Sequence, residues 1–378
     1  PALWSDTIPN AEQHRQDFDR AVNARLEECY YKPYSEWCVA HNVELTGHPA
    51  GPMDIGTLKY FQMPGQDVVW RYLEPFQAKS LEGPQSTMGK CSASAQVNYG
   101  RDRNMNECFG AYGWEFTYEE MRWLTDWLLV RGTNMIIPHA FYYSTRGKRR
   151  DERPPDVGPN NVWWDDYKVY ADYCRRISWL LAEGEQQCNT AILGTPIHLP
   201  WRAAKVLFEN QHDFNYLDTD TLLSKAKVTG DGIAVGTMKY KMLIVDGEEA
   251  INPEVLDALK PLLDAGRVVS FRTEVAGVSQ SADDVALMAE LDKRVKPDVQ
   301  IQPANPNIRY HHVLHGDTHL YFFTNEGPDP VDVQLKVSAQ GAAAWWNPET
   351  AEIEQDLNPT QLALKPYTSR VLCVSPSA

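Results

Sequence analysis

Helical and strand-like patterns alternate over the first half of the chain. Apolar side chains recur at helical spacing in four stretches, 17–41, 85–100, 117–131 and 165–183. Short apolar runs typical of strands lie beside them, at 42–49, 68–75, 104–110, 133–141 and 188–196. Apolar runs of this length, separated by helices, are typical of a parallel sheet with helical crossovers. The pattern therefore predicts an α/β protein with a (β/α) barrel in residues 1–205.

The predicted barrel lacks some of its strands. A complete eight-stranded barrel usually needs about 250 residues, and about 200 are present in this region. We therefore expect either an open sheet or a barrel whose first strands are missing. One of its helices has clear boundary signals, because Thr117 and Glu120 form a capping-box pattern and Gly132 follows the last helical residues.

Two smaller units are expected after the barrel region. In residues 206–300, apolar strand-like runs flank a helix that ends at Gly266, which predicts a flavodoxin-like or amidotransferase-like α/β domain. This unit has no Cys at a strand-to-helix turn, so we expect it to be structural. In residues 301–378, short alternating segments separated by turn signals predict an antiparallel β-sandwich.

Composition and charge narrow the class of protein. The net charge of −15 argues against a nucleic-acid partner, because phosphate binding needs a basic face. No apolar run is long enough for a membrane span, and no signal peptide is visible at the N-terminus. The seven scattered cysteines match no zinc spacing, so we expect no metal or cofactor and favour a cytoplasmic location. The twelve Trp and eighteen Tyr suit sugar stacking and a large core alike.

Glu107 is the first candidate for catalysis. It lies in NMNECFG, at the end of a predicted strand and before a loop rich in Gly and aromatic residues. In a (β/α) barrel, side chains at the carboxyl ends of the strands face the active site. A carboxylate there can act as acid, base or nucleophile, and glycoside hydrolysis needs two of them. The alternative is a partly buried Glu held by local hydrogen bonds.

Neighbouring predicted strands also end in polar residues. Glu74 ends the run 68–75, which makes it the candidate for a second carboxylate. Each of these residues alone is more often structural than a ligand, but their shared position at strand ends favours a substrate pocket. The expected substrate-binding residues are His48, Asp54, Trp70, Arg71, Asn106, His139, Tyr142, Tyr143, Trp163 and Trp164. The Trp163–Trp164 pair either stacks on sugar or caps a core.

Other catalytic patterns are absent from the sequence. It contains no GxSxG elbow, no GxxxxGK[ST] loop, no HExxH helix, and no GxGxxG after a strand. Serine-hydrolase, nucleotide-dependent and zinc-protease chemistry therefore lack their usual sequence signals.

Several segments resemble those of glycoside hydrolase family 106, the α-L-rhamnosidases, and of related family-2-like glycosidases. They include NECFGAYGW, EEMRWLTDWLLVRGTNMIIPHAFYYS and the late segments YFFTNEG and AWWNPETAEI. The resemblance covers nearly the whole chain, and it is more specific for the superfamily than for a substrate. It implies a catalytic glutamate at Glu107, with His139 and nearby aromatic residues shaping a sugar pocket.

The resemblance also implies a longer N-terminal region in relatives, which supplies the first barrel strands and a second catalytic carboxylate. No clear equivalent of that carboxylate occurs here, and Glu74 is the visible substitute. A partial barrel exposes apolar sheet edges, so we also expect a homo-oligomer that covers them.

The expected function is hydrolysis of a glycosidic bond in an oligosaccharide or glycoside, of the α-L-rhamnosidase type. Glu107 would act as base or nucleophile and Glu74 as acid. Two alternatives stay open: a β-glycosidase of the galactosidase, glucuronidase or glucanase type, and a catalytically inactive sugar-binding protein.

Overall fold

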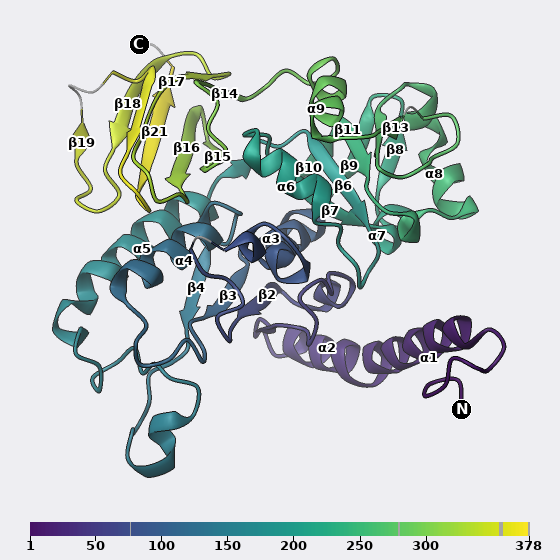
Figure 1. Ribbon diagram of the computed structural model, residues 1–378, viewed down its shortest axis with the longest axis horizontal. Coiled ribbons are helices and arrows are strands. Elements are labelled where there is room, and N and C mark those ends of the chain that lie inside the picture. Colours follow the sequence, from purple (N-terminus) through teal and green to yellow (C-terminus); the bar gives the residue numbers. More distant parts are fainter. Residues whose placement is uncertain (76, 279, 355–357, 377–378) are drawn as a thin grey trace.

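The computed structural model describes residues 1–75, 77–278, 280–354 and 358–376 (Figure 1). The chain forms three units in sequence order, with a helical arm before the first. Across the described ranges, no helix is both long and apolar enough to cross a membrane. All seven cysteines are free, and five of them are buried.

The first unit is a four-stranded parallel sheet in the order β1-β2-β3-β4. Its strands are β1 (Thr46–Gly47), β2 (Met63–Val68), β3 (Met105–Cys108) and β4 (Met135–Pro138). The helices α3 (Met88–Tyr99) and α4 (Tyr118–Leu129) connect β2 to β3 and β3 to β4, and α5 (Tyr167–Ala182) follows β4. This confirms the parallel sheet with helical crossovers, whereas closure into a barrel stays a prediction.

Two of the expected strands need correction. The strand expected at 68–75 is β2, which ends at Val68, because Trp70 and Arg71 have φ values of 58° and 50° that an extended strand does not allow. The run expected at 188–196 contains β6 (Thr190–Gly194), which pairs with β7 and β11 in the second unit. Fully buried parallel strands have the same apolar pattern in either sheet, so the pattern alone did not separate them.

Helix α4 begins as its sequence predicts. The Thr117 hydroxyl accepts a hydrogen bond from the Glu120 N–H, and the Glu120 carboxylate accepts one from the Thr117 N–H. The buried residues of α4 include Trp123, Trp127 and Leu128, and the apolar cluster around them also contains Val68 and Cys108 of the sheet. The capping box therefore fixes the start of the helix that separates the sheet from the sandwich.

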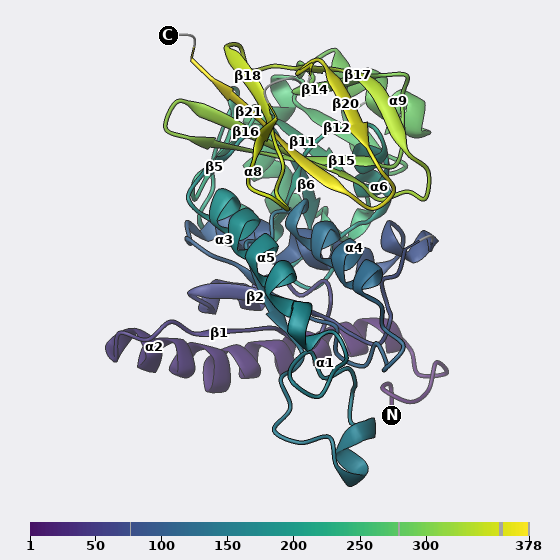
Figure 2. The same ribbon diagram turned by 90° about the vertical axis from the view of Figure 1, so that its left-hand side faces the viewer.

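The arm consists of α1 (Ala11–Leu26), a π-helical turn (Glu27–Tyr31) and α2 (Lys32–Ala40), and it projects along one edge of the first unit (Figures 1 and 2). This confirms the helix expected at 17–41. Its apolar face, however, is open to solvent in this chain: Phe18, Val22, Leu26 and Tyr30 are all classed as exposed.

The second unit is a five-stranded parallel sheet in the order β13-β12-β11-β6-β7. The strands are β6, β7 (Asn215–Asp218), β11 (Met242–Val245), β12 (Val268–Phe271) and β13 (Gln280–Ser281). Its helices are α6 (Arg202–Glu209), α7 (Thr219–Ser224), α8 (Pro253–Asp264) and α9 (Asp284–Asp292). A small antiparallel sheet of β8 (Lys227–Thr229), β9 (Gly232–Val235) and β10 (Met238–Tyr240) is inserted between β7 and β11.

The third unit is built from two antiparallel sheets, in agreement with the predicted β-strand content. One sheet contains β14 (Val299–Gln302), β17 (Val331–Val337) and β20 (Gln361–Leu364). The other contains β5 (Glu185–Gln186), β15 (Ile308–His315), β16 (Thr318–Asn325), β18 (Ala342–Trp346), β19 (Ile353–Glu354) and β21 (Ser369–Ser375). Buried side chains of both sheets share one core, and the larger sheet also packs on α4 and α5 (Figure 2).

Candidate active site

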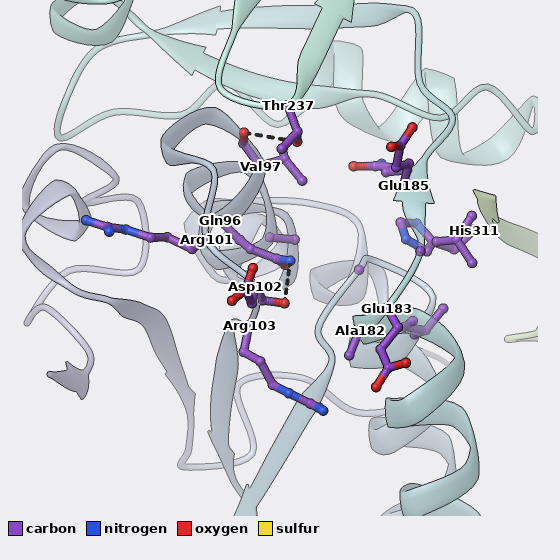
Figure 3. A pocket seen from close by; sticks show the side chains of 16 residues that line it. Gln96, Val97, Arg101, Asp102, Arg103, Ala182, Glu183, Glu185, Thr237 and His311 are labelled. Atoms are coloured by element: carbon purple, nitrogen blue, oxygen red, sulfur yellow. Dashed lines mark hydrogen bonds between the residues drawn. The ribbon is translucent and has the colours of Figure 1, made fainter. Parts of the chain in front are cut away.

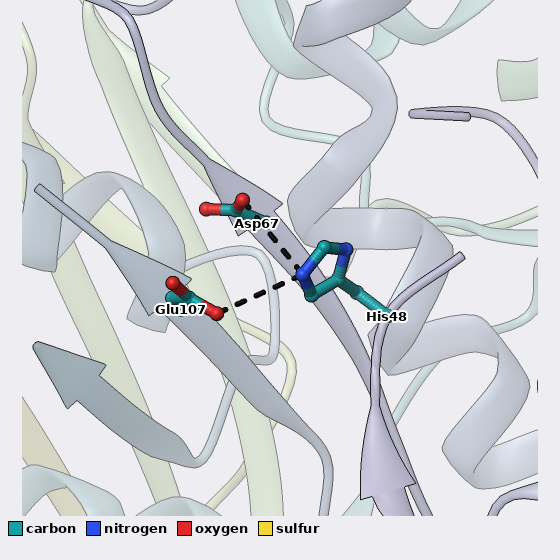
Figure 4. A group of neighbouring side chains, drawn as sticks. All are labelled: His48, Asp67 and Glu107. Carbon is teal, nitrogen blue, oxygen red and sulfur yellow. Dashed lines mark ion pairs between the residues drawn. The ribbon is translucent and has the colours of Figure 1, made fainter. Parts of the chain in front are cut away.

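Three polar side chains meet at the carboxyl ends of β1, β2 and β3: His48, Asp67 and Glu107 (Figure 4). His48 follows β1 directly, and Asp67 and Glu107 are each the last residue but one of their strands. Asp67 and Glu107 are partners in the parallel ladder, so their side chains leave the sheet on the same face. The register of two neighbouring strands thus places two carboxylates side by side.

The distances within this cluster are short. His48 Nε2 lies 3.8 Å from Asp67 Oδ2 and 3.7 Å from Glu107 Oε2. One ligand atom from each residue lies within 4.8 Å of the other two. The side chains keep 35%, 17% and 29% exposure for His48, Asp67 and Glu107, so a solvent molecule or substrate can reach them.

The surroundings of Asp67 strongly raise the pKa of its carboxyl group. Burial raises the pKa of Asp67 to about 6, and the negative charge of Glu107 adds to the rise, against weaker opposing effects from His48 and Arg153. Asp67 Oδ1 is buried and accepts no hydrogen bond within the described part of the chain. A carboxyl group with this pKa is partly protonated near neutral pH and can donate a proton.

The loop after β2 carries an exposed tryptophan at the same edge of the sheet. The Trp70 N–H donates to the Gly110 carbonyl oxygen at 3.0 Å, which ties the two loops together. The Trp70 side chain is 53% exposed, and the Arg153 guanidinium lies 5.5 Å from its ring centre. The charge of Arg153 also acts on Asp67, so the guanidinium lies within electrostatic range of that carboxyl group. An exposed indole at this place can stack on a sugar ring.

His139 follows β4 at the same edge of the sheet. Its N–H donates to the Cys108 carbonyl oxygen at 2.8 Å, and its ring lies over Gly110, where an added Cβ would come within 3.3 Å of the imidazole. His139 Nδ1 is buried without a hydrogen-bond partner among the residues described. The Tyr142 ring meets His139 edge-on at 6.1 Å, so these two expected residues lie together.

Glu74 does not join this cluster. It lies six residues beyond the end of β2 and accepts hydrogen bonds from Lys79 Nζ at 2.7 Å and from Arg71 at 3.1 Å. Burial raises its pKa, but these two cations outweigh burial and leave the pKa below its ordinary value. A carboxylate held ionised in this way is a poor proton donor. Arg71 itself is engaged by Glu74 and Glu120.

Other expected residues have local roles. Asn106 lies on the opposite face of the sheet, beside Gln66 and towards α3, and is completely buried. Asp54 accepts hydrogen bonds from the Thr57 N–H and hydroxyl, so it fixes a turn. Tyr142 donates to backbone carbonyl oxygens of the 152–153 loop, whereas Tyr143 is fully exposed.

The side chains of Trp163 and Trp164 pack in different places. Trp163 packs edge-on against Phe116 at 6.5 Å, next to the apolar cluster under α4. Trp164 is 39% exposed and stacks on Tyr167 at 5.6 Å. Trp163 therefore completes the core, and of the pair only Trp164 offers a surface to a ligand.

Asp67 is the residue that sequence reasoning missed. It lies in MPGQDV, where Pro64 and Gly65 suggest a turn rather than a strand. With His48 and Glu107 it also forms a group that could hold a metal ion through one imidazole nitrogen and two carboxylate oxygens. The same side chains can equally serve acid–base chemistry.

A pocket of about 470 Å³ lies at the opposite end of the same strands (Figure 3). Its lining includes Arg101, Asp102 and Arg103 before β3, Gly132 before β4, and His311 of β15. Barrel enzymes carry their chemistry at the carboxyl ends of the strands, whereas this pocket lies at the amino ends. We therefore place the candidate active site at His48, Asp67 and Glu107.

Two carboxylates side by side at the ends of parallel strands are the groups that glycoside hydrolysis needs, and the family comparison assigns the chain to that class. The chain belongs to glycoside hydrolase family 106: the family model, described as alpha-L-rhamnosidase, matches residues 69–293, which is more than half of the chain. This confirms the resemblance seen in the sequence. A search of curated proteins found no match.

Solved glycosidases share the fold. The rhamnosidase from Novosphingobium sp. PP1Y has a TM-score of 0.72 at 14% identity, and the match covers 92% of this chain and 38% of that chain. Gan42B, a GH42 beta-galactosidase from G. stearothermophilus, scores 0.63 at 9% identity, covering 89% and 64%. The beta-galactosidase from Rahnella sp. R3 scores 0.63 at 11%, covering 90% and 66%. This chain thus spans 38% of the rhamnosidase's length.

Proposed function

We propose that this chain carries a glycosidic-bond-cleaving site in which Asp67 and Glu107 are the two catalytic carboxylates. The observation that carries the proposal is the pairing of these residues in adjacent parallel strands, with their oxygen atoms within 4.8 Å. Glycoside hydrolysis needs one carboxylic acid and one carboxylate on either side of the scissile bond. Asp67 replaces Glu74 as the proposed acid.

The raised pKa of Asp67 suggests how the two roles divide. Asp67, with a pKa of about 6, protonates the leaving oxygen, and Glu107 acts as nucleophile or base. Retaining enzymes hold their carboxyl groups about 5–5.5 Å apart, whereas inverting enzymes need about 6.5–9.5 Å to admit a water molecule. The close approach of Asp67 and Glu107 favours retention. The His48 Nε2 atom faces both carboxylates, at 3.8 and 3.7 Å.

Family membership supports an α-L-rhamnoside as the sugar. A β-galactoside is the second candidate, because β-galactosidases share the fold. The inactive sugar-binding alternative rested on a missing second carboxylate, and under this proposal Asp67 takes that place. The test is a panel of nitrophenyl glycosides, for which we expect hydrolysis of the α-L-rhamnoside. A panel without any turnover would refute the proposal.

Asp67→Asn is expected to change stability in a pH-dependent way. The folded state raises the pKa of Asp67 from 3.8 to about 6, so ionised Asp67 destabilises the fold. Below pH 4, Asp67 is protonated in both states and does not destabilise the fold. The destabilisation appears as pH rises through 6 and the folded-state carboxyl group loses its proton. The variant should therefore gain about 1–2 kcal/mol over the wild type at pH 7.5 and nothing at pH 3.5.

Urea denaturation at both pH values measures this difference. The matched control is Asp257→Asn on the exposed side of α8, for which we expect the same small change at both pH values. A gain for Asp67→Asn that does not depend on pH would contradict the raised pKa.

We also propose that the open side of the first sheet is covered by a second copy of the chain. Within the described residues, β1 and β4 are the edges of the four-stranded sheet, and Ile137 of β4 is 36% exposed. Unpaired edges and exposed apolar residues favour association. Sedimentation at micromolar concentration should show a dimer, and a clean monomer would contradict this proposal.

A further inference from the structure

We propose that a groove between α4, α5 and the sandwich is a second saccharide-binding site, so that the chain favours oligosaccharides over single glycosides. We call it the α4 groove; it has a volume of about 600 Å³. The lining of the groove includes Tyr118, Arg122, Val169, Glu349 and Thr368. This volume falls within the range of about 300–1,000 Å³ usual for small-molecule sites.

Arg122 forms a rigid floor for the α4 groove. It is 7% exposed, and its guanidinium lies flat on the Tyr173 ring, 3.4 Å from the ring centre. Its terminal nitrogens face Asp126 at 3.4 Å and Glu349 at 3.3 Å. Its Nε is buried and has no hydrogen-bond partner among the described residues. The planar donor group is thus held in one orientation, and its terminal nitrogens, rather than the buried Nε, are the donors that a ligand could reach.

The walls of the groove are apolar, and its rim is polar. Tyr118 is 39% exposed and Val169 is 60% exposed, so a ring and an aliphatic side chain face the opening. The Glu349 side chain is 55% exposed, and Thr368, whose hydroxyl donates to the Lys365 carbonyl oxygen at 2.9 Å, also lines the groove. A sugar ring presents C–H groups on its faces and hydroxyl groups at its edges. Aromatic walls with carboxylate, guanidinium and hydroxyl groups around them fit both.

The charges of the groove argue against anionic ligands. Glu119 and Glu349 together outnumber Arg122, so a phosphate or another anion would meet net repulsion. The chain as a whole carries a charge of −15, which also disfavours a nucleic acid. A neutral polyol avoids both penalties, and it can hydrogen-bond to groups of either charge.

The position of the groove links it to the candidate active site. A neighbouring depression of about 300 Å³ shares Glu119 with the groove and reaches Glu74 and Pro75. That loop follows β2, the strand that carries Asp67. An oligosaccharide seated in the α4 groove can therefore extend along the start of α4 to the loop after β2, and its cleavage would take place at Asp67 and Glu107. This step rests on the proposed function, whereas sugar binding in the groove itself does not.

The test is binding of α-L-rhamnose-containing oligosaccharides of two to six residues by calorimetry, in a Glu107→Gln background that leaves the sugar intact. Tyr118→Ala should weaken binding about tenfold or more, because it removes the aromatic face on which a sugar ring would stack. Glu349→Gln, which keeps the side-chain shape, should weaken it severalfold. Tyr34→Ala, an exposed tyrosine on α2, is the matched control and should bind as the parent does.

Hydrolysis separates this inference from the proposed function. In the catalytically intact chain, Tyr118→Ala should leave kcat/KM for nitrophenyl α-L-rhamnoside unchanged and lower it for the oligosaccharides. Tyr118-dependent binding without any hydrolysis would support the groove and overturn the proposed function. Unchanged oligosaccharide binding in both Tyr118→Ala and Glu349→Gln would overturn the groove. Loss of self-association in these variants, without sugar binding, would assign the groove to a second copy and also overturn it.

Discussion

Replacement of Glu107 by Gln is expected to lower kcat on an aryl glycoside by about 1,000-fold or more, with little change in KM. The amide keeps the shape of the carboxylate but can neither attack the sugar nor take a proton from water. Acid–base or nucleophilic groups commonly contribute about 10²–10⁴-fold to the rate. Because the neutral amide still forms hydrogen bonds, ground-state binding of the sugar should persist.

Steady-state kinetics on the sugar that the panel identifies will measure this effect. Glu254→Gln, at the exposed start of α8, is the control and should keep wild-type kcat. Wild-type turnover in Glu107→Gln would remove Glu107 from the mechanism. A KM that rises while kcat stays constant would instead assign Glu107 to substrate binding.

Glu107→Gln should also shift the pH dependence of the remaining activity. The negative charge of Glu107 is, after burial, the largest cause of the raised pKa of Asp67. Removing that charge should lower the pKa of Asp67 from about 6 without returning it to its ordinary value, because burial remains. The residual activity of the variant should then be lost at lower pH than the wild-type activity. An unmoved pH profile would mean that Asp67 is not the acid.

Glu107 and His48 could be located from sequence because each follows an apolar run, whereas Asp67 could not. Its strand contains Pro64 and Gly65, which usually indicate a turn. In the structure Gly65 serves packing instead: an added Cβ would lie 2.5 Å from the Gly47 carbonyl oxygen and 2.5 Å from Met105. Only glycine lets β1 and β3 approach β2 this closely, and single-sequence reasoning has no access to that contact.

The misplacement of Glu74 has a related cause. The run VVWRYL is apolar enough to predict a strand, but Trp70 and Arg71 turn the chain with positive φ values. The Trp70 N–H bond to Gly110 and the Arg71 bond to the Tyr112 carbonyl oxygen, at 2.6 Å, hold this turn. These partners lie about forty residues away in sequence, so tertiary contacts override the local preference. The start of α4 could be predicted without tertiary contacts, because a cap such as Thr117 is a local sequence signal.

Glu326→Ala is expected to cost about 3–5 kcal/mol of the free energy of unfolding, because it leaves two guanidinium groups buried without a counter-charge. Glu326 Oε1 lies 2.5 Å from Arg131 and Oε2 lies 3.2 Å from Arg309. The three side chains are at most 6% exposed. Burial already lowers the pKa of Arg131 to about 10, against the opposing charge of Glu326.

This ion triad joins all three units of the fold. Arg131 follows α4, Glu326 and Arg309 belong to the sandwich, and both guanidiniums lie over the Phe208 ring of α6, at 4.5 and 6.0 Å from its centre. Its loss should therefore weaken the contacts between units more than the core of any one of them. Urea denaturation should show a lower midpoint and a broader or split transition in Glu326→Ala.

Glu290→Ala is the matched control, because Glu290 also bonds two cations, Lys293 at 2.6 Å and Arg294 at 2.5 Å, but on the surface of α9. Exposed ion pairs contribute about 0–1 kcal/mol, so this variant should unfold nearly as the wild type does. Equal small losses in the two variants would show that water replaces Glu326 in the triad. The units would then be held together by their other contacts, such as the buried Lys90–Asp213 ion pair, and the orientation of the first sheet under the sandwich would not depend on this triad.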